Sequence, residues 1–276
     1  MQSSVVAPIN PTAQLLHGIM MELRTLDSLS LPLSSREYIC HLTLCRLARR
    51  IETALPHHYG HGEQAAHYAM RLGQEAGLSP EDQTELHYAA LLHDIGLLTV
   101  PKHLTDPSAT LTPEEYILVQ SHSREGAQLL SEFRFLGRAA LWIAHHHEHW
   151  DGSGYPYGLR GFYVPLPARI LAVADSFDML VRQSGSAARA CRLLQASSGT
   201  QFDPSLVALA SELLQFPVQP VHAFQTKDAS PLGSRFGVEC ALPQRAGEGA
   251  SIPPEAPSSS LPANLPTGHM EEEELP

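Results

Sequence analysis

Apolar residues recur at three-to-five-residue spacing along most of the chain, and proline or glycine marks the ends of these runs. Ile39, Leu42, Leu47 and Ile51 form one such run, which Pro56 stops. This spacing is typical of amphipathic helices. Strand-type alternation is nearly absent, so the pattern predicts an all-α fold. Helices are expected over residues 35–56, 61–76, 79–97, 112–133, 137–147, 168–181, 187–196 and 203–214.

Composition separates one domain from two flanking segments. Residues 1–35 mix prolines with polar residues around a short apolar run, which predicts a loose, partly disordered N-terminal arm or one short helix. The helical domain is expected over residues 36–216, with a single core. Residues 217–276 are rich in proline, serine and glycine and contain four consecutive glutamates, which predicts a disordered tail.

The formal net charge of -11 argues against a general attraction for nucleic acid or for an anionic membrane. An anionic ligand would therefore have to be held by local groups or by metal ions. The four cysteines form no CxxC pair, which excludes a zinc finger and favours a reducing compartment. The sequence shows neither a signal-peptide pattern nor a membrane-spanning apolar run, so a cytoplasmic location is expected.

Histidines and aspartates lie on the apolar stripes of several expected helices. A single core histidine is more often a satisfied packing residue than a metal ligand. Here, however, five helices direct an imidazole or a carboxylate inward, and such groups are costly to bury without partners. A shared metal cluster would satisfy them together, and these donors suit Fe, Mn, Zn or Ni. The residues on these stripes are His61, His93, His122, His146, His147 and Asp175.

Residues 146–159 read HHEHWDGSGYPYGL and match the pattern HHExxDGxGYPxGL. This segment resembles the signature of the HD-GYP phosphohydrolases, and His93-Asp94 supplies the His-Asp pair of the wider HD superfamily. Residues 169–175, RILAVAD, and 199–204, GTQFDP, also match family motifs, so the resemblance extends over residues 61–214. It implies one HD-GYP-type helical domain.

The resemblance also implies a centre of two divalent transition-metal ions, Fe, Mn or another. Asp94 would be the catalytic residue, bridging the ions and orienting a metal-bridging hydroxide that hydrolyses cyclic di-GMP to linear pGpG or GMP. His57 lies where some members bind a third metal, although a surface histidine is the alternative. The ligands carried over are His61, His93, Asp94, His122, His146, His147 and Asp175.

Further roles follow from the same resemblance. Gly154, Tyr155 and Pro156 of the GYP loop would shape the substrate pocket and could contact signalling protein partners. Arg169 matches a family arginine and is the best candidate ligand for a substrate phosphate. Glu148 and Asp151 could accept hydrogen bonds from ligand imidazoles and so orient them, or they could cap the loop, and the sequence leaves both alternatives open.

Three positions depart from the family pattern: Leu97, Pro107 and Ser184 stand where cationic residues are usual. Losing two or three charge-assisted hydrogen bonds would weaken diester binding by several orders of magnitude. One hypothesis is therefore a phosphodiesterase for cyclic di-GMP or a related nucleotide, in which other cations compensate. The alternatives are a weakened protein that serves as a nucleotide-binding or protein-interaction module, and a phosphohydrolase for another phosphoester. The complete ligand set favours an enzyme.

Overall fold

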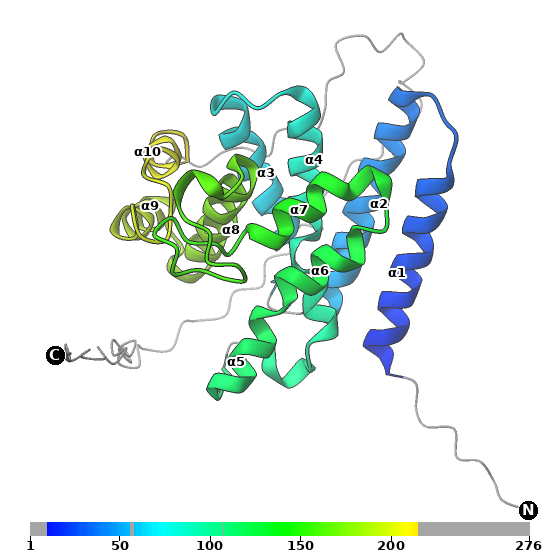
Figure 1. The fold of residues 1–276 in the computed structure, drawn as a ribbon, viewed down its shortest axis with the longest axis horizontal. Coiled ribbons are helices and arrows are strands. Elements are labelled where there is room, and N and C mark those ends of the chain that lie inside the picture. The colour runs from blue at the N-terminus through cyan, green and yellow to red at the C-terminus, as the bar shows by residue number, and fades with distance from the viewer. Residues whose placement is uncertain (1–9, 56–57, 107, 215–276) are drawn as a thin grey trace, which may run out of the picture. The chain divides into compact units, whose positions relative to one another are not determined.

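The computed structural model describes residues 10–55, 58–106 and 108–214 (Figure 1). These ranges contain α-helices and short 3₁₀ helices, labelled η, and no strand, so the all-α prediction is confirmed. The elements are α1 (Pro11–Ser28), α2 (Leu33–Ala54), α3 (His61–Glu75), α4 (Pro80–Leu92), η2 (His93–Thr99), η3 (Lys102–Leu104), α5 (Pro113–Gln120), α6 (His122–Leu130), η4 (Arg134–Leu136), α7 (Gly137–His145), η5 (Gly161–Tyr163), α8 (Leu166–Ser184), α9 (Ala187–Ala196) and α10 (Pro204–Leu213).

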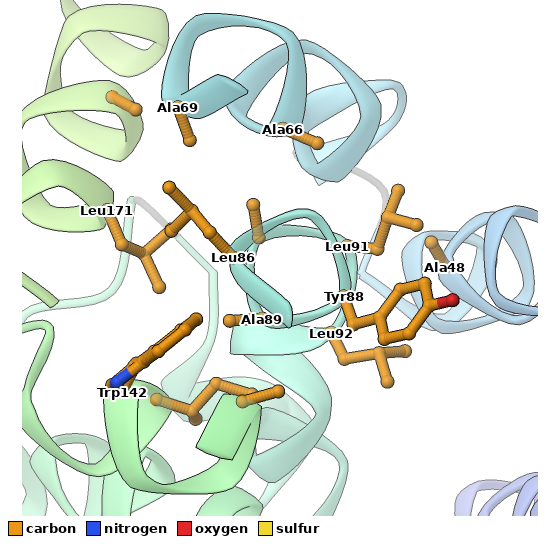
Figure 2. Close-up of a cluster of buried hydrophobic side chains, with 14 of the residues drawn as sticks. Ala48, Ala66, Ala69, Leu86, Tyr88, Ala89, Leu91, Leu92, Trp142 and Leu171 are labelled. Atoms are coloured by element: carbon orange, nitrogen blue, oxygen red, sulfur yellow. The ribbon is translucent and has the colours of Figure 1, made fainter. Parts of the chain in front are cut away.

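Helix α4 lies among α2, α3, α7 and α8. Ser79 caps its first turn by accepting a hydrogen bond from the N–H of Asp82, and Pro80 stands where the helix needs no N–H donor. The last five residues of α4, 88–92, are all buried, as expected for a helix surrounded by others. Figure 2 shows the neighbours around it: Ala48 of α2, Ala66 and Ala69 of α3, Trp142 of α7 and Leu171 of α8.

Three predicted helices differ in their extent. The helix expected over residues 79–97 ends at Leu92, where the chain tightens into η2. A Cβ atom on Gly96 would lie 1.9 Å from the carbonyl oxygen of His122, so η2 and α6 approach more closely than a side chain at this position permits. The helix expected over 112–133 is divided into α5 and α6 at Ser121, and α7 ends at His145 rather than at residue 147.

The predicted N-terminal arm contains α1, an 18-residue helix. Asn10 caps this helix by accepting a hydrogen bond from the N–H of Thr12. Ile19 and Leu23, one turn apart, are fully buried in the core of the domain. Of the two alternatives, a loose arm or one short helix, the described residues favour the helix, which is longer than expected and packs into the core.

The described residues all belong to one compact unit. The tail predicted over residues 217–276 lies outside the described residues. None of the described helices combines the length and the hydrophobicity that crossing a membrane requires.

Candidate metal centre

Seven predicted metal ligands come together from five elements of the fold. His61 opens α3, His93 and Asp94 open η2, His122 opens α6, His146 and His147 follow α7, and Asp175 lies within α8. Groups of these donors lie within 4.8 Å of one another: His122 with His146 and His147, and His61 with His93 and Asp175, while Asp94 lies with His61 and a further residue, His58. Most of these ligands stand at helix ends, where the chain changes direction and can project side chains into a shared space.

One half of the centre contains the two carboxylates. The Nε2 atom of His61 lies 3.0 Å from an oxygen of Asp175, and the Nε2 atom of His93 lies 3.4 Å from an oxygen of Asp94. Burial raises the pKa of Asp94, but the neighbouring imidazoles of His93 and His58 lower it well below its usual range. Burial also raises the pKa of Asp175, but the hydrogen bond from His61 and the neighbouring imidazoles together lower it below its usual value. Both carboxylates are therefore ionised and can bind cations.

The other half of the centre contains three imidazoles, those of the buried His122 and His146 and of the half-buried His147. The Nε2 atoms of His122 and His147 face each other at 3.2 Å, and the Nε2 atom of His146 is buried without a hydrogen-bond partner. Burial lowers the pKa of all three histidines, and for His146 and His147 the neighbouring imidazoles lower it further. The rings are thus neutral at pH 7, and their nitrogen lone pairs meet in one place. A divalent cation would satisfy them together.

Backbone carbonyls fix the orientation of three ligand rings. The Nδ1 atoms of His93, His122 and His146 lie 2.6–2.8 Å from the carbonyl oxygens of Ala90, Val119 and Ile143. Each carbonyl belongs to the residue three positions earlier in the chain. Because a carbonyl oxygen only accepts hydrogen bonds, Nδ1 must carry the proton in each ring and Nε2 is left to bind metal.

His61 is held by a residue that the sequence analysis did not identify. Its Nδ1 atom lies 2.7 Å from a carboxylate oxygen of Asp178, one helical turn after Asp175. Burial lowers the pKa of His61, but hydrogen bonds to Asp175 and Asp178 raise it to about 10. Asp178 also accepts a hydrogen bond from Arg182, whose guanidinium donates to the carbonyl oxygen of Tyr59. The spacing of Asp175, Asp178 and Arg182 on one helix face could have indicated this arrangement.

His58 is a second residue that contacts a predicted metal ligand and was not predicted from the sequence. Its Nδ1 atom lies 2.7 Å from Asp94, closer than the ring of His93. His58 precedes the first residue of α3, where helical periodicity gives no information about side-chain direction. The neighbouring His57, predicted as a possible third-metal ligand, lies outside the described residues.

Glu52 holds the backbone on both sides of His61, a role that was not predicted from the sequence. Its buried carboxylate accepts hydrogen bonds from the N–H groups of Gly60 and Gly62, at 2.7 and 2.9 Å. Gly60 has a φ of 71°, a conformation that glycine adopts readily. Glu52 thereby fixes the turn that precedes α3.

Glu148 and Asp151 both make loop-capping contacts. Glu148 is buried, and its two carboxylate oxygens accept hydrogen bonds from the N–H groups of Tyr157 and Leu159. Asp151 is exposed and accepts a hydrogen bond from the N–H of Ser153, and hydrogen bonding by the side chain and the backbone of Ser153 lowers the pKa of Asp151. Of the two roles left open by the sequence, these contacts favour capping, and the role of orienting ligand imidazoles stays a prediction.

The GYP loop folds back onto a metal ligand. The rings of Tyr155 and His147 stack with centroids 4.9 Å apart, and the N–H of Tyr155 donates to the carbonyl oxygen of His147. A Cβ atom on Gly154 would lie 2.2 Å from the backbone nitrogen of His149, so only glycine fits this turn. The loop and the metal centre therefore form one continuous structure. Roles for Gly154, Tyr155 and Pro156 in substrate binding stay predictions.

Arg169 is already engaged within the protein. Its guanidinium forms an ion pair with Asp203, donates from Nε to the carbonyl oxygen of Val164, and lies over the rings of Trp150 and Phe162. Asp203 is 4% exposed, so the ion pair is buried. A phosphate-binding role for Arg169 stays a prediction, and it would require this pair to open.

Of the three positions where the family usually has a cationic residue and this chain does not, Leu97 and Ser184 lie in the described part of the chain. Leu97 is 7% exposed and belongs to the hydrophobic core. The hydroxyl of Ser184 donates to the carbonyl oxygen of Leu180. Arg182 lies two residues before Ser184. Its guanidinium donates to Asp178, and Asp178 contacts the predicted metal ligand His61, so the positive charge of Arg182 lies near the candidate centre.

Comparison with known proteins identifies similar chains. A family model described as HD domain matches residues 46–206. The cyclic di-GMP phosphodiesterase response regulator RpfG of Xanthomonas campestris pv. campestris (strain 8004) is 39% identical over 172 residues, which are 60% of this chain and 46% of that protein. A cyclic di-GMP phosphodiesterase of Thermotoga maritima is 33% identical over 182 residues, which are 63% of this chain and 50% of that protein.

Among solved structures, a cyclic GMP-AMP specific phosphodiesterase of Vibrio cholerae, V-cGAP3, aligns with a TM-score of 0.51 and 25% identity. This alignment covers 63% of this chain and 49% of that one. The chain spans about half the length of these relatives. The family model covers more than half of this chain, and the His-Asp pair and the GYP loop lie within the match. The chain therefore belongs to the HD domain family, as a member of its HD-GYP group.

Proposed function

We propose that the protein is a metal-dependent phosphodiesterase that hydrolyses cyclic di-GMP to linear pGpG or GMP. The observation that carries this proposal is the convergence of seven histidine and aspartate ligands, among them the partnerless Nε2 atom of His146. The names of the relatives from Xanthomonas campestris and Thermotoga maritima support the choice of substrate. A cytoplasmic location is part of the same proposal.

The donor set fits two divalent ions. The three imidazoles of His122, His146 and His147 form one group of donors, and His61, His93 and Asp175 form another. Asp94 lies beside His93 and His58, and it would serve both ions, as the family resemblance implies. When bound, such ions lower the pKa of a water molecule and stabilise the charge that develops on the phosphate. Fe or Mn suits the mixture of nitrogen and oxygen donors.

The chain's own residues orient the ligands and the substrate. His58 holds the Asp94 carboxylate, and Asp178 holds the ring of His61. We assign Tyr155, whose ring stacks on His147, to a nucleotide base of the substrate. Arg182 is the cation that we assign to the substrate phosphate, in place of those absent at Leu97 and Ser184, because its ion pair with Asp178 is partly exposed.

The exposed rings of Phe162 and Tyr163 follow the GYP loop. Exposed aromatic side chains are common at protein interfaces. We assign this surface to a signalling protein partner, as the family resemblance implies. A pull-down in which Phe162→Ser and Tyr163→Ser retain activity but lose the partner would support this assignment.

Turnover is the decisive measurement. Purified protein loaded anaerobically with Fe(II) or Mn(II) is incubated with cyclic di-GMP, cyclic GMP-AMP and a phosphomonoester, and the products are separated. We expect linear pGpG or GMP from cyclic di-GMP, and no product with the Asp94→Ala variant. The V-cGAP3 relative is named for cyclic GMP-AMP. If this protein hydrolysed cyclic GMP-AMP in preference, the proposed substrate would be wrong but the proposed phosphodiester hydrolysis would stand.

A nucleotide-binding module is the second candidate, and the buried Leu97 with the neutral Ser184 favours it. Metal content and nucleotide affinity measured on the same samples distinguish the two. A protein that binds two metals and cyclic di-GMP but releases no product would reject the enzyme and support the module. A protein that hydrolyses only the monoester would instead indicate a phosphohydrolase for another phosphoester.

A further inference from the structure

A second group of metal-binding side chains lies on helices α2 and α4, and it shares no residue with the candidate centre. His41 and Cys45 are four residues apart on α2 and so lie on the same face of that helix. His87 faces them from α4. One donor atom from each of the three residues lies within 4.8 Å of the other two.

The distances among these atoms are close to those of a metal site. The Nδ1 atom of His41 lies 2.9 Å from the Nε2 atom of His87, and the sulfur of Cys45 lies 3.9 Å from the His41 ring nitrogens. Tetrahedral zinc, with bonds of about 2.0 Å to nitrogen and 2.3 Å to sulfur, separates two nitrogens by roughly 3.3 Å and nitrogen from sulfur by roughly 3.6 Å. For these two pairs of atoms, side-chain shifts of a few tenths of an ångström would give the distances of a zinc site, and the Cys45 sulfur and the His87 ring lie within the same 4.8 Å group.

The protonation states also favour a metal. Burial lowers the pKa of His41, and burial together with the neighbouring His41 lowers the pKa of His87 to about 3. Both imidazoles are therefore neutral at pH 7, as metal binding requires. The thiol of Cys45 would release its proton when the metal binds.

We propose that His41, Cys45 and His87 form a second metal site that binds Zn²⁺ and joins α2 to α4. Imidazole and thiolate donors are those that zinc prefers, and three protein ligands leave a fourth position for water or another ligand. The site differs chemically from the candidate centre described above, whose predicted ligands are nitrogen and oxygen donors only.

A metal at this site would act on the elements that present the candidate centre. Helix α4 leads directly into His93 and Asp94, six and seven residues after His87. Helix α2 carries Glu52, which holds the backbone of Gly60 and Gly62 beside His61. Zinc binding would therefore fix both elements against each other without touching substrate.

Cobalt(II) substitution tests the site, because thiolate bound to cobalt gives a near-ultraviolet charge-transfer band that histidine and aspartate ligands do not give. Full-length, chelator-treated, reduced protein is titrated with Co²⁺. We expect the band in the wild type, its loss in Cys45→Ser, and its removal by added Zn²⁺. Cys40→Ser, a change at a nearby buried cysteine, is the matched control and should retain the band.

Two further variants keep the test decisive if Cys45→Ser does not fold. A protein with Cys40, Cys191 and Cys240 replaced by serine keeps Cys45 as its sole cysteine and should retain the band. His87→Gln should move the cobalt titration to higher concentration by at least about tenfold, the loss typical even of residues that only hold a metal ligand in place. Cobalt-loaded wild type without the band, or an unchanged band in Cys45→Ser, would overturn the proposal.

Discussion

The ring of His61 lies between two carboxylates, Asp175 at Nε2 and Asp178 at Nδ1. Asp178 orients the ring and makes it a better metal donor, so its effect should appear in metal affinity. We expect Asp178→Asn to lower Mn²⁺ affinity by about 10–100-fold with the fold retained, since asparagine keeps an acceptor but not the charge. A competition titration measures this change. Glu132→Gln, at an exposed carboxylate, is the control, and equal affinities would exclude this role for Asp178.

The buried ion pair of Arg169 with Asp203 gives a prediction that separates a structural role from a phosphate-binding one. Removing one member of a buried pair leaves the other charge without compensation. We expect Arg169→Ala to lower the free energy of unfolding by about 3–5 kcal/mol in chemical denaturation. Arg134→Ala, whose side chain is 87% exposed, should leave stability nearly unchanged. Unaltered stability with a raised KM would instead support phosphate binding.

Among individual residues, the sequence predicted the ligands better than the groups that hold them. Asp94 and the ligand histidines stand in sequence motifs, so their convergence could be expected before their positions in space were known. His58 and Glu52 hold Asp94 and the turn before α3, whose path depends on Gly60 and on contacts far along the chain. Such contacts leave no local pattern in the sequence.

Among the elements, the contact of η2 with α6 sets the spacing between Asp94 and His122. Gly96 allows this contact, because a Cβ atom there would meet the carbonyl oxygen of His122. We expect Gly96→Ala to push the two elements apart, lowering both stability and turnover. Thermal unfolding and activity assays measure the two effects. Gly137→Ala, where a Cβ atom meets nothing within 4 Å, is the matched control, and similar losses in both variants would contradict this explanation.

Glu85 connects α4 to α7 by accepting a hydrogen bond from the N–H of Ala139. Burial raises the pKa of Glu85 above its usual value, against the effect of that hydrogen bond. A carboxyl group with a raised pKa in the folded state binds its proton more tightly there, so stability falls as the pH rises through the raised pKa. Glutamine has no proton to lose.

We therefore expect Glu85→Gln to gain stability relative to the wild type between about pH 4 and about pH 7. Urea denaturation at both pH values measures the difference. A relative stability that does not change with pH, or that falls as the pH rises, would contradict the raised pKa.

Helix boundaries divide into those that local chemistry decides and those that tertiary contacts decide. The helix expected from residue 112 begins with a capping box of Thr112 and Glu115, and α9 spans the predicted residues 187–196. The end of α4 at Leu92 could not be predicted in the same way. It depends on the approach of η2 to α6, where Gly96 meets His122 from far along the sequence.

Across the whole molecule, the candidate centre concentrates buried polar groups in a hydrophobic core. A ligand that binds only the folded chain stabilises the fold, so we expect Mn²⁺ to raise the free energy of unfolding by about 2.7 kcal/mol at a concentration 100 times its Kd. Unfolding monitored with Mn²⁺ and with chelator measures this gain. Asp94→Ala should reduce it, and a gain of equal size in that variant would place the stabilising ion elsewhere.

The all-α class followed from the periodicity of the sequence, whereas the membership of α1 in the core did not. Prolines around its start suggested a loose segment, but Pro11 lies in the first helical turn, where proline is tolerated. The burial of Ile19 and Leu23 depends on surfaces presented by other helices, which a local reading of the sequence does not contain.

The carbonyl groups that orient His93, His122 and His146 belong to the main chain, which every amino acid provides. Substitutions at Ala90, Val119 or Ile143 that preserve the helices would leave these hydrogen bonds in place. The cations that hold a substrate have no such protection, because each depends on one side chain. Over evolutionary time, a chain of this kind can change its substrate, or lose it, while its metal centre persists.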